Sequence, residues 1–202
     1  MPLFPETVTV LVGSGKEISA AIDLAGKVVD IGRPASGRNA TIRSLLKKLD
    51  VGDDFFGSVK ELEPTASVSQ LCEGSIDAAS FVVGHPSELV HDALSECDAT
   101  LAKFAGPRID ALLAESDNYH SARIDPALYE ELTVPVESIS VMATLVTRAD
   151  LETKIVLDLA NAIKANAAIL PEEQPVLRSL GKTVATTAEL GAPSHPAVQG
   201  SD

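Results

Sequence analysis

The hydrophobic positions of this chain alternate between short continuous runs, typical of buried strands, and spaced patterns typical of helices. The β-branched run Thr7–Val12 ends at a Gly-Ser-Gly turn, whereas Arg38–Leu49 carries apolar residues at i, i+3, i+4 and i+7 from Ile42. Strands are predicted over Thr7–Val12, Lys27–Gly32, Ile76–Val83 and Thr100–Phe104. Helices are predicted over Glu17–Leu24, Arg38–Leu49, Val68–Cys72, Pro86–Cys97 and Pro107–Ala114. This alternation predicts an α/β fold with a mostly parallel sheet covered by helices on both sides.

The pattern changes in the last third of the chain. A long β-rich run, Val134–Thr147, precedes a strongly amphipathic helix from Leu151 to about Ala168. Shorter helical pieces follow, broken by proline and glycine, and the tail Gly191–Asp202 is too rich in Pro, Gly and Ser to predict a regular element.

Composition and charge exclude several classes of function. The chain has 202 residues, 45% hydrophobic and 22% charged, which indicates a folded protein of one large or two small domains. Its 29 acidic and 16 basic residues give a net charge of −13, and only 3% of residues are aromatic. Such a surface repels phosphate backbones and offers few rings for base stacking, so we expect no nucleic-acid partner. The same charge disfavours an anionic membrane surface.

The first residues and the cysteines add two expectations. The chain begins without a charged segment and apolar run of the kind that forms a signal peptide, so, if Met1 is the true start, it stays where it is made. Cys72 and Cys97 have no metal-ligand spacing, and no two histidines do either. We therefore expect no metal site and no cofactor, and two buried thiols rather than a disulfide.

The segment Val12-Gly13-Ser14-Gly15-Lys16 resembles the end of a phosphate-binding loop but lacks two of its elements. Val10 stands at the position of the first glycine, and Glu17 stands at the position of the magnesium-binding Ser or Thr. We interpret the segment as a strand-to-helix turn. Asp77 is predicted to be structural, with its carboxylate accepting bonds from the backbone.

The loop Gly32–Asn39 is the best candidate for a ligand site. It leaves the carboxyl end of a predicted strand and opens a predicted helix, where free N–H groups and the helix dipole favour anions. Gly32 and Gly37 let the backbone approach a ligand closely. Ser36 offers a hydroxyl, and Arg33 and Arg38 offer cationic forks suited to a carboxylate. From Lys27 to Lys48 the chain has six basic residues and one acidic residue. The alternative is that Ser36 only caps the helix and the arginines lie in solvent.

A second candidate is Gly84-His85-Pro86, at the junction of a predicted strand and helix. His85 could act as a general base only with a nucleophilic partner, and no Ser or Cys stands in a nucleophile context. We favour a histidine that caps a helix or lines a cleft over a catalytic residue.

Several blocks of this sequence occur together, in the same order, in one known family. They are Asp23–Gly32 followed by Ser36-Gly37, Leu71–Ala78, Gly84-His85-Pro86, the tyrosine-bearing stretch with Tyr119 and Ile124–Tyr129, Val141–Leu151 and His195-Pro196. Through these blocks the chain resembles the TAXI-type solute receptors, the extracytoplasmic binding proteins of one branch of TRAP transporters.

The resemblance implies a type II periplasmic-binding-protein fold, in which two α/β lobes joined by hinge strands close over a small carboxylate, such as an amino acid or dicarboxylate, for a TRAP-type permease. Residues 1–148 would form an α/β ligand-binding lobe with hinge strands, and residues 149–202 a helical segment that packs back toward the first lobe. The ligand-binding residues implied by the loop and by the resemblance are Arg33, Ser36, Gly37, Arg38, Asn39, Gly84, His85, Tyr119 and Tyr129. The location would be periplasmic if the full-length protein has a leader.

The sequence also departs from this family. The family usually has Thr where this chain has Arg38, and a small residue or Pro where it has Arg33. Much of the family's first lobe, including a Gly/Tyr-rich ligand-contacting segment, has no counterpart here. One alternative is therefore a truncated receptor that binds no ligand and self-associates through the surface left by the missing lobe. A second, less favoured alternative is an enzyme on the same fold that uses His85.

Overall fold

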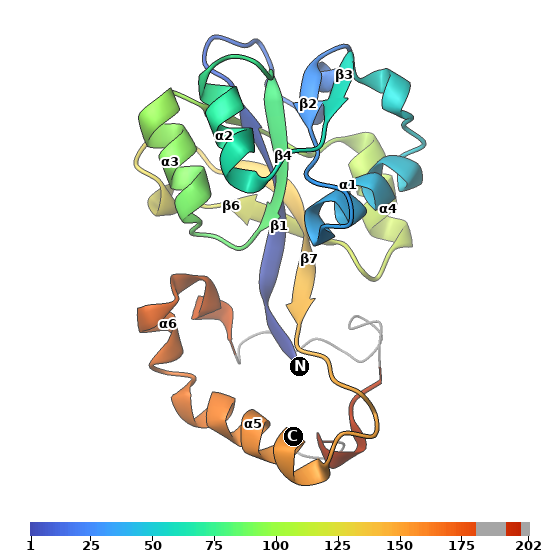
Figure 1. Ribbon diagram of the computed structural model, residues 1–202, viewed down its shortest axis with the longest axis vertical. Coiled ribbons are helices and arrows are strands. Elements are labelled where there is room, and N and C mark those ends of the chain that lie inside the picture. Colours follow the sequence, from blue (N-terminus) through green and yellow to red (C-terminus); the bar gives the residue numbers. More distant parts are fainter. Residues whose placement is uncertain (181–192, 199–202) are drawn as a thin grey trace. The chain divides into compact units, whose positions relative to one another are not determined.

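The computed structural model describes residues 1–180 and 193–198, and its elements follow the α/β order expected from the sequence (Figure 1). The strands are β1 (Pro2–Val12), β2 (Val28–Asp30), β3 (Ser58–Lys60), β4 (Ala78–Val83), β5 (Thr100–Ala102), β6 (His120–Ile124) and β7 (Val136–Thr144). The α-helices are α1 (Gly37–Lys48), α2 (Pro64–Cys72), α3 (Glu88–Cys97), α4 (Pro107–Glu115), α5 (Thr153–Asn166) and α6 (Leu170–Glu173). None of the helices in the described ranges has the length and apolar character needed to cross a membrane.

The strands form one mixed sheet in the order β3-β2-β4-β1-β7-β6, with β5 also paired to β1. Strand β2 runs parallel to β3 and β4, but β1 runs antiparallel to both β4 and β5, and β6 antiparallel to β7. The expectation of a mostly parallel sheet is therefore wrong. Alternating strands and helices predict parallel neighbours only where sequential strands pair, whereas β1 pairs with strands that lie far along the chain.

The described chain divides into two compact units. One unit is Glu6–Ser140, which contains β2 to β6, parts of β1 and β7, and α1 to α4, and the other combines Met1–Pro5 with the chain from Val141 onward. The ends of the long strands β1 and β7 belong to the second unit. The boundary predicted from the sequence, after residue 148, lies within this second unit.

One part of the core of the larger unit lies between the sheet and the helices α2 and α3, and buried residues of α1 and α4 form another part. In Figure 1 these two helices lie on one side of the sheet, while α1 and α4 lie on the other. Phe81 of β4 is 2% exposed and belongs to a buried cluster with residues of β1, α2 and α3. The members of this cluster are Leu11, Leu71, Ile76, Ala79, Phe81, Val90, Ala93, Leu94, Ala99, Ile124 and Tyr129. This packing fixes the strand ends that carry the candidate site.

A disulfide joins Cys72 and Cys97, which stand at the last positions of α2 and α3. The expectation of two free thiols is therefore wrong. The two helices pack against each other, so that the Cα atoms of the two cysteines lie 5.0 Å apart, within the range that a disulfide spans. The two cysteines are 25 residues apart in the sequence, and this spacing does not indicate that they lie close together.

Several elements differ in length from the prediction. The helix predicted over Glu17–Leu24 is only a 3-10 turn, Ala21–Leu24, because the Asp23 carboxylate accepts hydrogen bonds from the backbone N–H groups of Ser19 and Ala20, each 2.9 Å long. The helix predicted from Val68 begins earlier, at Pro64. Strands β3 and β6 were not predicted. Of the proline-rich tail, residues 191, 192 and 199–202 lie outside the described ranges, and Pro196–Val198 forms a 3-10 turn.

Candidate functional site

The two candidate loops begin at the same edge of the sheet. Strands β2 and β4 are parallel neighbours, with Val29 opposite Ala78 and Asp30 opposite Ala79, so their carboxyl ends point the same way. The loop from Ile31 to Ser36 follows β2, and Gly84-His85-Pro86 follows β4. Ligands of open α/β sheets collect at such an edge.

Ser36 is the N-cap of α1. Its hydroxyl accepts a bond of 3.1 Å from the backbone N–H of Asn39 and donates one of 2.7 Å to the carbonyl of Arg33. The N–H groups of Gly37 and Arg38 precede that of Ala40, which is the first to donate within the helix, so they have no intrahelical acceptor and lie at its positive end. The cap occupies the Ser36 hydroxyl, so these two amides are the donors left at the start of the helix.

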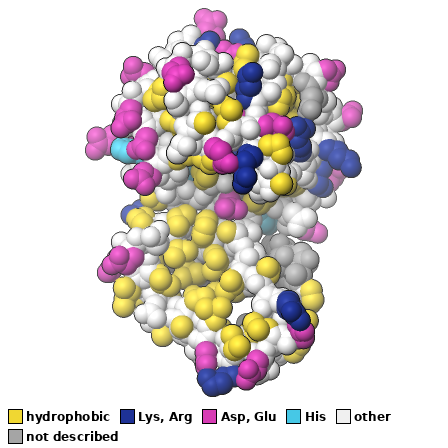
Figure 2. Space-filling view, viewed as in Figure 1, with side chains coloured by type: hydrophobic (Ala, Val, Ile, Leu, Met, Phe, Trp, Pro, Cys, Tyr) yellow, Lys and Arg dark blue, Asp and Glu magenta, His cyan; other side chains and the backbone are white. Residues whose placement is uncertain are grey.

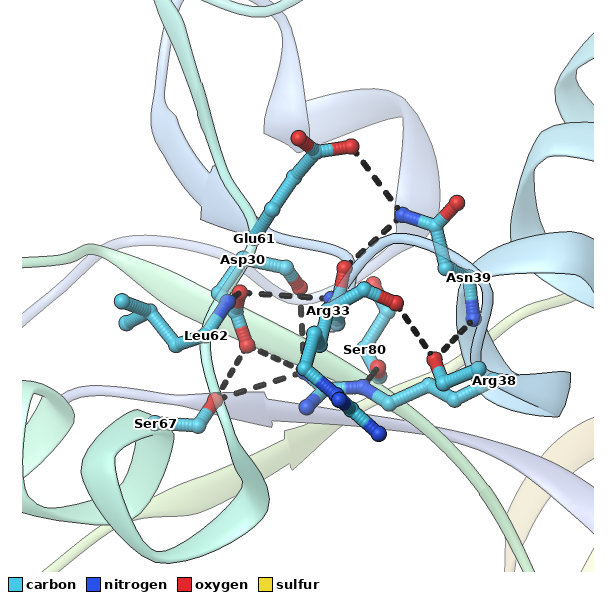
Figure 3. Close-up of polar contacts among 10 residues, drawn as sticks. Asp30, Arg33, Arg38, Asn39, Glu61, Leu62, Ser67 and Ser80 are labelled. Carbon is cyan, nitrogen blue, oxygen red and sulfur yellow. Dashed lines mark hydrogen bonds and ion pairs between the residues drawn. The ribbon is translucent and has the colours of Figure 1, made fainter.

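Asp30, the last residue of β2, holds the base of this loop together (Figure 3). Its carboxylate is completely buried and accepts hydrogen bonds from the N–H groups of Gly32 and Leu62, at 3.2 and 2.8 Å. The hydroxyl of Ser67 in α2 donates a short bond to the same carboxylate, and the guanidinium of Arg38 forms an ion pair with it. One buried charge thus joins β2, the strand-to-helix loop after β3, α1 and α2.

Arg38 is the counter-charge of Asp30. Its side chain is 10% exposed, its Nε donates to the carbonyl of Ser80 at 2.5 Å, and its guanidinium lies 3.9 Å from the centroid of the Phe81 ring. Burial lowers the pKa of Arg38 from its ordinary value and the Asp30 carboxylate opposes this, so the group stays protonated. Among the described residues, Nη1 has no hydrogen-bond partner. The structure therefore commits Nε and Nη2 to the protein, while Nη1 is buried.

Gly32 lets Arg38 take this position. A Cβ atom at residue 32 would lie 2.6 Å from the Cδ atom of Arg38, and the φ angle of +90° disfavours any residue with a side chain. The glycine that the sequence suggests for close approach of a ligand instead accommodates a side chain of the protein.

The remaining polar residues of the loop pair with acidic side chains beyond β3. Arg33 is 61% exposed and its Nε lies 2.9 Å from the carboxylate of Glu63. Asn39 is buried, and its side-chain amide donates to the carbonyl of Gly32 at 2.8 Å and to Glu61 at 3.2 Å. Arg33 is thus the accessible cation of the loop, and Asn39 fixes its shape.

His85 lies in a second network, with Thr9 of β1 and Tyr129. Its Nε2 is 2.9 Å from the hydroxyl of Thr9, and its Nδ1 is 2.6 Å from the hydroxyl of Tyr129. The Thr9 hydroxyl donates to the carbonyl of Thr7, so it accepts from Nε2. The Tyr129 oxygen accepts from the N–H of Ser87 at 2.8 Å, which leaves its proton for Nδ1. These directions assign the neutral Nε2–H tautomer to His85.

Burial sets the ionisation of both rings. It lowers the pKa of His85 to about 4, since charging the imidazole would place a cation in a desolvated site. Burial also raises the pKa of Tyr129 to about 12, with the bond from Ser87 acting in the opposite direction. Both side chains are therefore neutral near pH 7, and both nitrogens of the histidine are engaged. This arrangement suits a residue that positions the Gly84–Pro86 loop.

Tyr119 lies elsewhere in the same unit. It is buried, its hydroxyl donates to that of Ser44 at 3.3 Å, and the ammonium of Lys48 is 5.9 Å from its ring centroid. These contacts are with the middle and end of α1, whereas the candidate loop lies at its start. The structure thus brings Tyr129 to His85 and leaves Tyr119 apart from both.

Sequence reasoning missed the residues that hold the site together, namely Asp30, Ser67 and Thr9. A charged residue inside the otherwise apolar strand Lys27–Gly32 is the one signal that could have indicated Asp30, because a buried carboxylate requires a partner. One other expectation is confirmed, the structural role of Asp77. Its carboxylate accepts a bond of 2.8 Å from the N–H of Val28 and pairs with Lys16 of the glycine-rich turn at 2.7 Å. That turn follows β1 as expected, but it leads to the 3-10 turn Ala21–Leu24 and not to an α-helix. The described residues contain no cluster of three or more groups able to hold a metal ion.

Comparison with known proteins identifies the family and the fold of this chain. The model of the NMT1-like family matches residues 1–199. The periplasmic aliphatic sulphonate binding protein SsuA from Escherichia coli is similar over 98% of this chain and 55% of its own, with 14% identity and a TM-score of 0.50. An ancestral arginine-binding protein bound to arginine is 14% identical over 83% of this chain and 57% of its own, with a TM-score of 0.47.

The alkanesulfonate-binding protein SsuA from Xanthomonas axonopodis pv. citri bound to MOPS is 14% identical over 94% of this chain and 57% of its own, with a TM-score of 0.47. Because the identity is only 14%, the comparison with the Escherichia coli protein shows the fold alone. That fold is the type II periplasmic-binding-protein fold. The chain spans little more than half the length of these solved structures.

Proposed function

Because the chain belongs to the NMT1-like family, we propose that it is an extracytoplasmic solute-binding protein that captures a small carboxylate for a TRAP-type membrane permease. The observation that carries this proposal is the start of α1. The backbone N–H groups of Gly37 and Arg38 have no intrahelical acceptor, and the exposed side chain of Arg33 belongs to the loop that leads from β2 into this helix. This is a site for a small anion.

The local charge supports an anionic ligand. The stretch Lys27–Lys48 carries six basic residues and one acidic residue, and that residue, Asp30, is neutralised internally by Arg38. Arg33 and Arg43 pair with Glu63 and Glu61 at the surface, and Lys27, Lys47 and Lys48 add further positive charge to the stretch in a chain whose net charge is −13. His85 and Tyr129 hold the neighbouring Gly84 loop, so we assign them a positioning role and propose no catalytic residue.

A sulfonate is the second candidate ligand. It presents three oxygens to the same donors, and the Escherichia coli protein that shares the fold is named for binding aliphatic sulphonates. We favour the carboxylate because a planar carboxylate matches the planar guanidinium fork in a bidentate pair. An amino acid such as glutamate, or a C4 dicarboxylate, fits this chemistry.

The disulfide supports a location outside the cytoplasm. Such bonds persist in oxidising compartments, and Cys72–Cys97 joins two helices of the core of the larger unit. The TRAP-type permease is the partner that the sequence resemblance implies.

Thermal unfolding in the presence of candidate solutes tests the proposal. Glutamate, glutamine, succinate and an alkanesulfonate are titrated separately against the protein. A true ligand at 100 times its dissociation constant adds about 2.7 kcal/mol to the free energy of unfolding. A higher unfolding temperature with a carboxylate supports the proposal. A higher unfolding temperature with the sulfonate alone shows that the ligand is a sulfonate and not a carboxylate. No shift with any of the four contradicts it and favours a fragment without ligand activity.

The variant Arg33→Ala locates the site. Arg33 is exposed and paired only with the exposed Glu63, so its removal leaves the fold intact, and we expect the ligand-induced shift to weaken. Arg148→Ala is the matched control, since Arg148 is 83% exposed and paired with Asp150 in the other unit. Equal ligand-induced shifts in both variants would exclude Arg33 from the site.

A further inference from the structure

A cavity of about 550 Å³ lies within the larger unit, between α4 and the antiparallel pair β6 and β7. Pockets that hold small ligands have volumes of about 300–1,000 Å³. In the sheet, β6 is separated from β2 by β4, β1 and β7, which places it about 19 Å from the strand that leads into α1. The cavity is therefore distinct from the loop at the start of α1.

The register of β6 and β7 directs two charged side chains toward this cavity. Arg123 lies opposite Glu137, and Ser121 lies opposite Ile139, so these four side chains project from one face of the strand pair. Ile124 projects from the other face and belongs to the core cluster with α2 and α3. Helix α4 lies on the side of the sheet opposite α2 and α3 (Figure 1), so it covers the face that carries Arg123 and Glu137.

One wall of the cavity is apolar. Ile109 and Leu113 are four residues apart and therefore lie on the same face of α4, which lines the cavity. Phe104, in the loop before α4, and Ile139 of β7 complete this wall. Such a wall accommodates the hydrocarbon or aromatic part of a ligand.

Three charged side chains, those of Asp110, Arg123 and Glu137, also line the cavity. None of them forms a side-chain hydrogen bond or ion pair with another residue in the described part of the chain, although Arg123 and Glu137 lie opposite each other. Figure 2 shows acidic and basic side chains scattered over the visible face of the larger unit, the ordinary arrangement on a protein surface. Here, in contrast, one cation and two carboxylates line a single cavity beside an apolar wall.

This combination of groups is complementary to a zwitterion. A ligand with only a carboxylate would face two acidic side chains, and a simple amine would face the guanidinium of Arg123. We propose that the cavity is a second ligand site, for an α-amino acid with a large apolar side chain. Arg123 binds the carboxylate of this ligand, Asp110 and Glu137 accept hydrogen bonds from its ammonium group, and the apolar wall contacts its side chain.

Equilibrium dialysis of the whole chain with labelled L-phenylalanine tests the site. Two competitors each lack one charge: 3-phenylpropionate has no ammonium group, and phenethylamine has no carboxylate. We expect phenylalanine to bind and each competitor to bind about tenfold or more weakly, because each leaves a charged group of the site without its partner. Absence of phenylalanine binding at millimolar concentration overturns the proposal, and so does a competitor that binds as tightly as phenylalanine.

Single variants locate the bound amino acid. Arg123 is exposed, so Arg123→Gln keeps the fold, which far-UV circular dichroism checks, and we expect it to weaken phenylalanine binding about tenfold or more. Arg148→Gln, at a residue 83% exposed in the other unit, is the matched control and should bind as the wild type does. Equal binding by these two variants overturns the proposal. Binding that is lost in Arg33→Ala and kept in Arg123→Gln overturns it too, because the amino acid then occupies the loop before α1.

Discussion

The buried histidine predicts how stability depends on pH. His85 has a pKa of about 4 in the folded protein, against 6.5 for an unperturbed histidine, because charging it would place a cation in a desolvated site. Protonation would also break the bond that Nδ1 accepts from Tyr129. Between pH 6.5 and 4 the unfolded chain therefore binds more protons at this residue than the folded one. The free energy of unfolding contributed by His85 falls as the pH falls through this window.

The two pKa values give the magnitude. Linkage between them predicts a loss of about 2 kcal/mol from pH 7 to pH 5, growing to about 3 kcal/mol by pH 4. Carboxylates elsewhere also titrate in this range, so the change in the free energy of unfolding of the wild type combines their contributions with that of His85. A variant that removes only the histidine separates the two contributions.

Urea unfolding at pH 7 and pH 5 measures this contribution. His85→Gln keeps an amide donor that can reach Thr9 but does not titrate, so we expect it to lose about 2 kcal/mol less than the wild type between the two pH values. His91→Gln, at an exposed position of α3, is the matched control and should follow the wild type. Identical losses for the wild type and His85→Gln would refute the view that burial keeps His85 neutral.

Two further predictions concern the interior of the larger unit. Replacing Arg38 with Met should lower the free energy of unfolding by about 3–5 kcal/mol in urea titrations, because it leaves the buried Asp30 carboxylate without its counter-charge; a change below 1 kcal/mol would contradict this. Replacing Cys72 and Cys97 together with Ser should cost about 2–4 kcal/mol in the same assay, and a reducing agent should lower the stability of the wild type alone. Equal sensitivity of both proteins to the reductant would contradict the pairing.

The sequence predicts those elements whose signals are local. Helix α1 was expected over Arg38–Leu49 and is found over Gly37–Lys48, because the Ser36 cap and the apolar spacing both lie within one segment. The strand expected over Lys27–Gly32 is likewise found, as β2 over Val28–Asp30. Elements defined by distant partners were missed. Strand β3 has only three residues and pairs with β2, and β6 is formed by pairing with β7, which local propensity does not encode.

The candidate site shows the same division at the level of single side chains. A basic loop at a helix start can be read from the sequence, but which of its arginines is free depends on a carboxylate elsewhere in the chain. Asp30 forms a buried ion pair with Arg38. Glu63 pairs with Arg33 at the surface, where the Arg33 side chain remains 61% exposed. Gly32 adds to the ambiguity, because a glycine needed for a ligand and a glycine needed for the Arg38 side chain look alike in sequence. Arg38 therefore acts first of all to hold the loop, through its ion pair with Asp30 and its bond to the carbonyl of Ser80.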